Sequence, residues 1–487
     1  MASIVQDQLP DPNANAVSDP HAAKFDFHSL SVKAAGDERL TNALNANTLR
    51  QYEGRRERLL ELPDPDGMRS LAGDIKQHTL DHLDYYLEQF QSSVEGNGGR
   101  VHFAHDGAAA RRIIAEIAKQ AGCTRVIKSK SMTSEEIELA HHLQAEGLDL
   151  VETDLAEFIL QISHDKPSHL VAPVMHKDRA SIARLFNEYF KTPYNDDPPT
   201  LTAQARIFLR NKFRRADLGI TGGNFLIAET GQVCVVENEG NARQSVTTPR
   251  VLVSLVGIEK LVPRLADLAV MLKLLGRSAT GQVMTVYTSI FGGPRLGGEK
   301  DGPEEFHIVL LDNGRTEILA SREYRETLRC IRCGACLNAC PVYRKIGGHA
   351  YGSVYPGPIG ALITPLFQGL EKFKDLPHAS SLCGACYEVC PVKIDIPKHL
   401  INLRRDINTR RISGRSERFI YKAWAWGMKS PWVYYVLGIL QKFDLRRRAH
   451  KTGWIRSLPP FVAGWTQVRD MPAPPKRTFH QIWKDRT

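Results

Sequence analysis

The sequence CIRCGACLNACP, residues 330–341, places four cysteines ahead of a proline at spacings of three, three and four residues. A second run, CGACYEVCP at residues 383–391, repeats the last three cysteines and the proline. Such spacing lets three thiolates of one run bind three irons of a cubane, while the cysteine before the proline binds the other cluster in two-cluster ferredoxins. The two runs therefore predict one iron-sulfur unit that holds two clusters and carries electrons.

Cross-ligation divides the seven thiolates into two sets. We expect cluster 1 to be bound by Cys330, Cys333, Cys336 and Cys390, and cluster 2 by Cys340, Cys383 and Cys386. A complete second run would carry a cysteine at the position of Ser380, which Ser381 follows. We expect [4Fe-4S] clusters, but the second set leaves three alternatives open: a [3Fe-4S] cluster, a four-iron cluster with a non-cysteine ligand, or a ligand from a partner subunit.

Other uses of these cysteines fit the pattern less well. Paired CxxC elements also make four-cysteine zinc sites, but two runs that both end in Cys-Pro are more specific than one CxxC. Disulfides are disfavoured because thiols this dense in an otherwise cysteine-poor chain suit a reducing compartment. Cys123 and Cys234 stand alone in apolar segments, which is typical of core residues.

Length and composition indicate a multidomain cytoplasmic protein. The chain has 487 residues and 42% hydrophobic content, enough for two to four domains with cores. The first 20 residues are polar and proline-rich and lack the basic-then-apolar pattern of a signal peptide. No stretch of 18 apolar residues exists, and the nearest, 432–440, is too short to span a bilayer.

Charge and tryptophan are concentrated at the C-terminal end. From residue 401 onward the chain carries 19 Lys and Arg against five Asp and Glu, and all six tryptophans lie there. Such a segment suits docking on a partner subunit or peripheral contact with anionic lipid on the inner face of the cell membrane. A helical appendage that packs its tryptophans on the cluster domain is the alternative. Nucleic acid is not expected, because no recognition motif accompanies the charge.

The region before the cysteines alternates between strand-like and helix-like segments, which indicates an α/β layer with a parallel sheet. The sequence predicts helices within 36–97 and a β-rich part from 218. Asn313-Gly314 predicts a hairpin over 306–320. The expected strands are 100–106, 124–130, 149–154, 168–174 and 249–263, and the expected helices are 108–122, 134–147, 177–190, 203–216 and 264–276.

Two places in this α/β region are candidate ligand sites. Lys128 and Lys130 end a strand before Thr133-x-x-Glu136, a capping-box pattern, and a helix start at the carboxyl edge of a sheet favours a carboxylate or phosphate. Ordinary capping with solvated lysines is the alternative. The second place is a polar stretch for which surface turns are the simpler interpretation: Asn224, Glu229, Thr230, Glu237, Glu239, Asn241 and Arg243. The histidines His164, His169 and His176 flank one expected strand and receive no role.

Several common catalytic motifs are missing. The chain has no GxGxxG between a strand and a helix, no GxxxxGK[ST] and no GxSxG, so the sequence identifies no dinucleotide, ATP or serine-hydrolase site and no catalytic residue. A cluster transfers one electron at a time, whereas oxidation of an alcohol releases two, so another component would supply the substrate-oxidising centre. We expect a non-catalytic electron-transfer subunit.

As a whole the chain resembles the LutB-type lactate-utilization iron-sulfur proteins. The resemblance rests on KSKSMTSEEIEL, VETDLAEFILQI, PSHLVAP, GITGGNFLIAETGQV and the two cysteine runs in this order, and it covers nearly all of the chain after about residue 40. It implies a LUD domain, which is CoA-transferase-like in fold, followed by an all-α helical-ferredoxin domain and a helical C-terminal extension. The expected division is a disordered lead at 1–35, a helical segment at 36–97, the LUD α/β domain at 98–320, the iron-sulfur domain at 321–403 and the basic segment at 404–487.

The resemblance also implies a role in oxidising L-lactate to pyruvate, with a cysteine-rich redox subunit and a second LUD-domain subunit as partners. A subunit of another 2-hydroxy-acid oxidase, such as glycolate oxidase, would carry the same cysteines. A ligand-binding LUD protein with structural or sensory clusters is the alternative from a different class.

Overall fold

The computed structural model describes residues 25–449, 452–459, 462–466 and 469–486. The chain divides into two compact units with the boundary between Ile407 and Asn408. Most of the predicted lead, residues 1–24, lies outside the described residues. Its last part is not a disordered lead, because Asp26 caps a helix, α1 (Phe27–Ala35), through a bond from the Ser29 amide.

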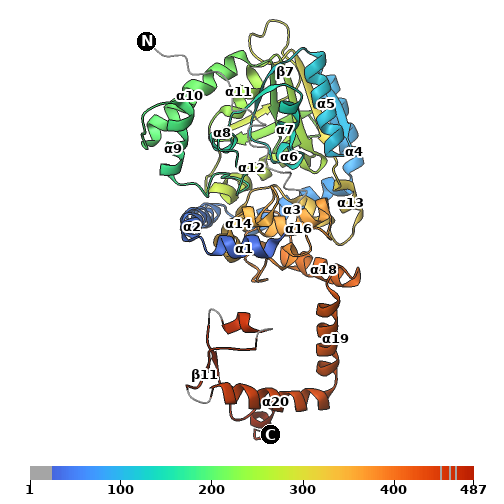
Figure 1. Cartoon of the computed structure of the whole chain (residues 1–487). Helices are drawn as coiled ribbons and strands as arrows, with labels where there is room; N and C mark the ends of the chain where they lie inside the picture. Colours follow the sequence, from blue (N-terminus) through green and yellow to red (C-terminus); the bar gives the residue numbers. More distant parts are fainter. Residues whose placement is uncertain (1–24, 450–451, 460–461, 467–468, 487) are drawn as a thin grey trace. The chain divides into compact units, whose positions relative to one another are not determined.

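Helices form the segment before the sheet, as predicted for 36–97. They are α2 (Glu38–Leu60), α3 (Pro65–Asp81) and α4 (Leu83–Gly96). Asp64 caps α3, and Pro65 occupies its first turn. Proline is tolerated there because backbone N–H groups in the first turn have no acceptor within the helix. In Figure 1 α1, α2 and α3 lie beside the helices of the cysteine segment, and α2 contacts both α14 (Ala335–Ala339) and α15 (Pro341–Ile346).

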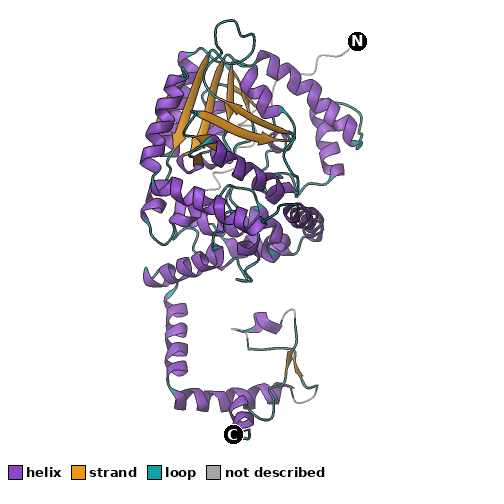
Figure 2. Ribbon diagram, turned by 180° about the vertical axis from the view of Figure 1, so that it is seen from behind, coloured by secondary structure: helices purple, strands orange, loops and turns teal. Residues whose placement is uncertain are grey.

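The main sheet has six parallel strands in the order β1-β10-β7-β4-β2-β3. Side chains of β7 alternate between two cores: Val253 and Leu255 face one, and Leu252 and Val256 face the other. Both faces are therefore buried, as parallel sheets require, and Figure 2 shows helices around the strands. The strands are β1 (Arg100–Ala104), β2 (Arg125–Lys128), β3 (Asp149–Glu152), β4 (Leu218–Thr221), β7 (Val251–Gly257) and β10 (Glu305–Leu311).

A second sheet has four strands in the order β8-β5-β6-β9. Its centre is the hairpin of β5 and β6, which turns at Thr230 and Gly231. The strands are β5 (Phe225–Ile227), β6 (Gln232–Glu237), β8 (Leu261–Val262) and β9 (Tyr287–Phe291). The helices of the α/β region are α5 (Gly107–Gln120), α6 (Met132–Glu136), α7 (Leu139–Ala145), α8 (Leu155–Ile162), α9 (Arg179–Phe190), α10 (Pro198–Arg215), α11 (Asn241–Thr247), α12 (Leu265–Thr280) and α13 (Arg315–Ala320).

The hairpin predicted over 306–320 is wrong. β10 pairs with β1 on one side and β7 on the other, so neither edge is free for a returning strand. Asn313 and Gly314 do turn the chain with positive φ angles, but Gly314 starts α13 instead of a second strand. Asn313 and Gly314 thus predicted the turn correctly, but they did not determine whether a strand or a helix would follow it.

Two further local predictions are wrong. Residues 168–174 form turns instead of a strand, because the His169 ring accepts hydrogen bonds from the Val171 and Ala172 amides. The capping box at Thr133 and Glu136 does not form. Ser131 caps α6, and the Glu136 carboxylate binds Arg315.

The cysteine segment, residues 321–403, contains helices and turns without a strand. Its glycines allow tight connections: Gly334 and Gly384, one residue after Cys333 and Cys383, have φ of 76° and 85° and start short helices. The remaining helices are α16 (Gly357–Gln368), α17 (Ala385–Glu388) and α18 (Ile396–Thr409), the last of which reaches the unit boundary.

The second unit is mostly helical. It contains α19 (Arg415–Lys429), α20 (Pro431–Ala449), α21 (Phe479–Lys484) and a short antiparallel pair of β11 (Trp454–Ile455) and β12 (Met471–Pro472). Among the described residues, no helix has both the length and the apolar character needed to cross a membrane.

Candidate iron-sulfur centre

The seven cysteines of the two runs lie on loops and short helices of the first unit. Cys333, Cys336, Cys340, Cys386 and Cys390 are buried, Cys330 is half-buried and Cys383 is exposed. Burial raises the pKa of Cys333 and of Cys386 to about 12. Such thiols stay protonated at neutral pH unless a positive metal centre replaces the proton, so this donor set suits a metal that brings its own charge.

The two runs interleave in space. Burial raises the pKa of Cys390, and backbone hydrogen bonds lower it. Among the charged neighbours, Cys330 of the other run has the largest effect and raises this pKa further. Cys340 raises the pKa of Cys386 in the same way, and Cys383 raises that of Cys340. Helix α14 also contacts α17. Cysteines of the two runs are therefore neighbours in space, and Cys336 interacts with both Cys386 and Cys390.

Backbone amides point at the sulfur atoms of both sets. Amides of Arg332, Tyr343 and Ile394 lie 3.4, 3.4 and 3.3 Å from the sulfurs of Cys330, Cys340 and Cys390. Hydrogen bonds of this kind stabilise negative charge on cluster thiolates and are one means by which a protein sets the reduction potential.

The spacing of the sulfurs disfavours zinc. In a tetrahedral zinc site with Zn–S of about 2.3 Å, the sulfurs lie about 3.8 Å apart. All seven cysteines are among the described residues, and within that part of the chain no three sulfurs lie within 4.8 Å of one another. A cubane carries each thiolate on a different corner iron and does not need three sulfurs this close, so the residues are compatible with iron-sulfur clusters.

Buried cations surround the first set. Arg55 and Lys76 come from α2 and α3, Lys260 follows β7, and Arg332 lies between two of the cysteines; all four are buried or nearly so. Burial lowers the pKa of Arg55, while the neighbouring Cys333 and Cys390 raise it. The Nζ atom of Lys76 donates to the carbonyl oxygens of Glu259 and Leu261. A cluster in this position would sit in a positive environment.

One buried ionic network joins the cysteine segment to the carboxyl edge of the sheet. Arg315, after β10, binds both oxygens of Glu136 at 2.9 Å and Glu259 at 2.5 Å. From the cysteine segment, the Tyr355 hydroxyl donates to Glu136 at 2.5 Å and Arg332 lies 3.6 Å from Glu259. We call these five residues the Arg315 cluster. They fix the first cysteine run against the α/β domain.

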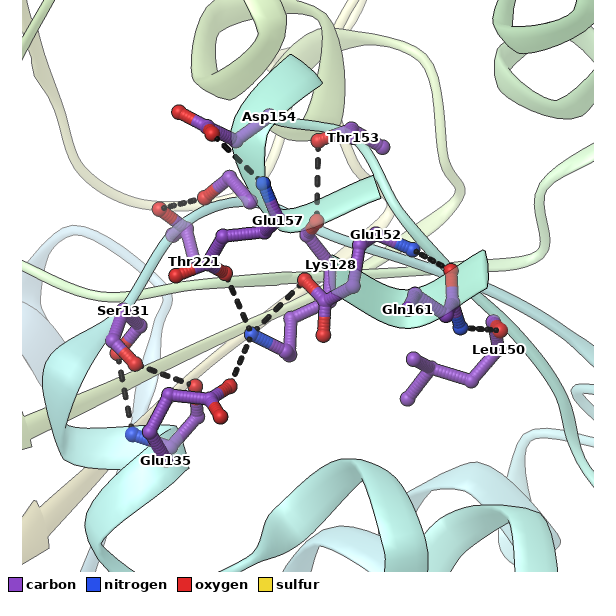
Figure 3. Close-up of polar contacts among 12 residues, drawn as sticks. Lys128, Ser131, Glu135, Leu150, Glu152, Thr153, Asp154, Glu157, Gln161 and Thr221 are labelled. Carbon is purple, nitrogen blue, oxygen red and sulfur yellow. Dashed lines mark hydrogen bonds and ion pairs between the residues drawn. The ribbon is translucent and has the colours of Figure 1, made fainter. Parts of the chain in front are cut away.

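A second ionic network lies at the ends of β2 and β3 (Figure 3). The Nζ atom of Lys128 is 3.1, 3.0 and 3.4 Å from carboxylate oxygens of Glu135, Glu152 and Glu157, and its side chain is fully buried. We call these four residues the Lys128 cluster. Burial disfavours the charged lysine, but the three carboxylates raise the pKa of Lys128 well above its ordinary value. Burial raises the pKa of Glu157 to about 7 in spite of the lysine.

Other residues predicted to bind a ligand instead form hydrogen bonds with backbone groups. Lys128 is not the solvated lysine of the simpler interpretation, and its charge is already matched; Lys130 donates to the Val171 carbonyl at 2.7 Å. In the polar stretch, Glu237 accepts from the Ala242 and Arg243 amides, and Glu239 from the Leu155 amide. Asn224 accepts from Val236 and Glu229 from Leu265. These contacts organise turns.

The sequence did not predict that His169 contacts the cysteine segment, where its partner is Asn338. His169 Nδ1 accepts two backbone amides, which leaves Nε2–H to donate to Asn338 Oδ1 at 3.2 Å. Asn338 lies between Cys336 and Cys340, one from each set. Burial lowers the pKa of His169 to about 3, so the ring stays neutral. The loop sequence held no periodic signal that could have revealed this contact.

Three family models match successive segments of the chain. Family models match as "LUD domain" at residues 87–311, "4Fe-4S dicluster domain" at 326–394 and "Lactate utilisation protein B, C-terminal" at 411–487. The "4Fe-4S dicluster domain" match covers both cysteine runs.

Curated relatives match over most of their length. "Lactate utilization protein B" of Bacillus licheniformis is 44% identical over 92% of this chain and 94% of its own, and that of Bacillus subtilis is 42% identical over 94% and 96%. "Uncharacterized electron transport protein YkgF" of Escherichia coli is 42% identical over 90% and 92%. A solved structure of a duf162 family protein from Deinococcus radiodurans is 13% identical over 47% of this chain and 98% of that chain, with a TM-score of 0.27.

Proposed function

Because the chain belongs to the lactate utilization protein B family, we propose that it is the iron-sulfur electron-transfer subunit of a complex that oxidises L-lactate to pyruvate. The observation that carries this proposal is the interleaving of two cysteine sets in one domain, with Cys390 beside Cys330 and Cys340 beside Cys386. When bound, the clusters would each accept and release one electron at a time.

The ligands proposed for the two clusters differ in what surrounds them. Cys330, Cys333, Cys336 and Cys390 would bind a four-iron cluster beneath the α/β domain, where buried Arg55 and Lys76 favour the extra negative charge of the reduced state. Cys340, Cys383 and Cys386 would bind the second cluster. Cys383 is exposed, and the Ser381 hydroxyl hydrogen bonds to its sulfur. The second site is therefore the proposed point of electron exchange with a partner.

A donor subunit must oxidise the substrate, because this chain shows no motif for that step. A cysteine-rich redox subunit and a second LUD-domain subunit are the proposed partners. An anaerobic pull-down with the native partners, followed by electron paramagnetic resonance before and after L-lactate, tests the role. Lactate-dependent reduction supports it. Clusters that dithionite reduces but lactate does not, with the partners present, would favour glycolate or another 2-hydroxy acid, or a structural or sensory role.

Cross-ligation has its own test. Cys340→Ser should disturb the cluster built mainly by the second run, and Cys390→Ser the one built mainly by the first, each lowering the iron content by up to about half. Cys123→Ser is the matched control, because this buried thiol lies beside Arg250 outside both cysteine runs. Loss of only the cluster nearest in sequence would contradict the assignment.

We further propose peripheral contact between the second unit and anionic lipid on the inner face of the cell membrane. On α19 and α20 large apolar side chains are exposed, among them Phe419 (73%), Trp426 (66%) and Trp432 (73%), and Arg446, Arg447 and Arg448 follow in the last turn of α20. Co-sedimentation of the cluster-loaded chain with phosphatidylglycerol vesicles should exceed that with neutral vesicles and weaken in salt. Equal co-sedimentation with both vesicle types would overturn this proposal.

A further inference from the structure

A group of metal-ligating side chains lies outside the cysteine sites, where the loop after α8 meets the cysteine segment. Asp165, His176 and His349 offer one oxygen and two nitrogens that lie within 4.8 Å of one another. His176 Nε2 is 3.0 Å from Asp165 Oδ2, and His349 Nε2 is 3.9 Å from Oδ1. Two imidazoles and one carboxylate are a ligand set that divalent transition metals use.

Hydrogen bonds determine which nitrogen of His176 faces this group. The Ser168 hydroxyl donates its proton to the Pro173 carbonyl at 3.0 Å. Because its proton is used there, this hydroxyl can accept from His176 Nδ1–H at 2.8 Å. In that tautomer the Nε2 lone pair of the neutral ring points at the Asp165 carboxylate. Two acceptors 3.0 Å apart need a proton or a cation between them.

The second histidine comes from the cysteine segment and is held close to the first. The His176 and His349 rings are 4.5 Å apart between centroids. His349 Nε2–H donates to the Lys166 carbonyl oxygen at 2.8 Å, so a metal ion at this nitrogen would displace that proton and its hydrogen bond. Neighbouring Gly348 passes so near the loop that a Cβ there would lie 1.9 Å from the Ser168 carbonyl oxygen.

We propose that Asp165, His176 and His349 bind a divalent transition metal ion, with Zn²⁺ as the best-fitting candidate, that joins the loop at 165–176 to the cysteine segment. Ser168 is the outer partner that orients His176, as such partners do in metalloproteins. His349 has 44% of its side chain exposed, so an ion can enter from solvent and keep a water ligand.

Lys177 is the competitor of this ion. Its Nζ is 2.6 Å from Asp165 Oδ2 and supplies a positive charge when no metal is bound. Lys177→Met should therefore bind the metal more tightly than the wild type.

The test uses the full chain with its iron-sulfur clusters intact, kept anaerobic and treated with chelator to remove loosely held metal. Zn²⁺ is titrated by competition with a fluorescent zinc indicator, and zinc and iron are counted after gel filtration. We expect one zinc per chain and a raised unfolding temperature. His176→Gln and His349→Gln should each weaken binding at least about tenfold, and Ser168→Ala about 10- to 100-fold.

His164→Gln is the matched control, because His164 lies in the same loop, is exposed and is not part of the group. Its affinity for zinc should equal that of the wild type. Zinc that is retained by the His176→Gln and His349→Gln double variant with unchanged iron content would be bound elsewhere and would overturn the proposal. Absence of zinc binding by Lys177→Met would overturn it as well.

Discussion

The Arg315 cluster and the Lys128 cluster lie at the same carboxyl edge of one sheet, yet their charges are balanced differently. Arg315 and Arg332 face two carboxylates, Glu136 and Glu259, so the first cluster is neutral as a group. Lys128 faces three carboxylates. Burying two uncompensated negative charges is costly. Burial raises the pKa of Glu152 well above its ordinary value and that of Glu157 to about 7, so we expect the second cluster to hold a proton.

The difference follows from what covers each end of the edge. Over β7 and β10 the cysteine segment supplies Arg332 and the Tyr355 hydroxyl, which complete the Arg315 cluster. Over β2 and β3 the helices α6 and α8 supply Glu135 and Glu157, which add two more carboxylates to the one that Glu152 already provides. One group of charges thus fixes the iron-sulfur segment, and the other is expected to make the stability of the α/β domain depend on pH.

The largest expected effect is that of Arg315→Met. It leaves Glu136 and Glu259 buried without their main counter-ion, which should lower the free energy of unfolding by about 3–5 kcal/mol. Anaerobic denaturant unfolding of the cluster-loaded chain measures this loss. Arg125→Met is the control, because its ion pair with Asp217 is half-exposed and should contribute only about 0–1 kcal/mol. Equal losses of unfolding free energy in the two variants would show that the Arg315 cluster stabilises the fold no more than a half-exposed ion pair does.

Lys128→Met should cost less than Arg315→Met, because Glu152 and Glu157 can take up protons when the lysine is gone. We expect a loss of about 1–3 kcal/mol near pH 5, increasing as the pH rises and the three carboxyls are forced to ionise. Unfolding curves of the variant and the wild type at pH 5 and pH 8 measure it. A loss independent of pH would show that the carboxyls do not share the proton as inferred.

Glu157→Gln should flatten the pH dependence of stability. The folded pKa of Glu157 is raised by burial from 4.5 to about 7, so the folded chain holds a proton that the unfolded chain releases. Stability should therefore fall as the pH rises from about 4.5 to about 7, by at most about 1.4 kcal/mol per pH unit, and level off above. Glutamine cannot ionise, so the part of this slope that Glu157 contributes should be lost in the variant, while Glu239, whose pKa burial also raises to about 7, keeps its own part. Exposed Glu116, changed to Gln, should keep the slope of the wild type.

The smallest expected effect is that of the Lys76 charge on the reduction potential of the cluster at the first cysteine set. Lys76→Met removes a buried cation whose pKa burial lowers to about 7, so the comparison belongs near pH 6, where the lysine is mostly charged. We expect the reduction potential of the cluster at that set to fall by up to about 60 mV, a tenfold change in a one-electron equilibrium. Redox titration followed by electron paramagnetic resonance should show the second cluster unchanged. Lys119→Met, in the last turn of α5, is the control. A fall in the reduction potential of equal size in this variant would contradict a local effect of Lys76.

Local patterns predicted much of the fold. Short apolar runs identified β1, β2 and β3, and amphipathic stretches identified α5, α9 and α12. Thr230-Gly231 identified the turn between β5 and β6. The predictions failed where a local signal was compatible with two outcomes. Asn313 and Gly314 marked a turn, but the pairing of β10 on both edges decided that a helix would follow.

Cysteine spacing, by itself, determined that this chain binds iron-sulfur clusters, because ligand spacing within a run is a property of the local backbone. The sequence also determined the order of the segments and the basic, tryptophan-rich end. Only the tertiary structure decided which charges meet: Glu136 with Arg315, Lys128 with Glu152 and Glu157, His169 with Asn338, and His176 with His349. Pairs such as these join segments that are far apart in the chain or lie on separate strands and helices, and their energies depend on burial, which no local pattern encodes.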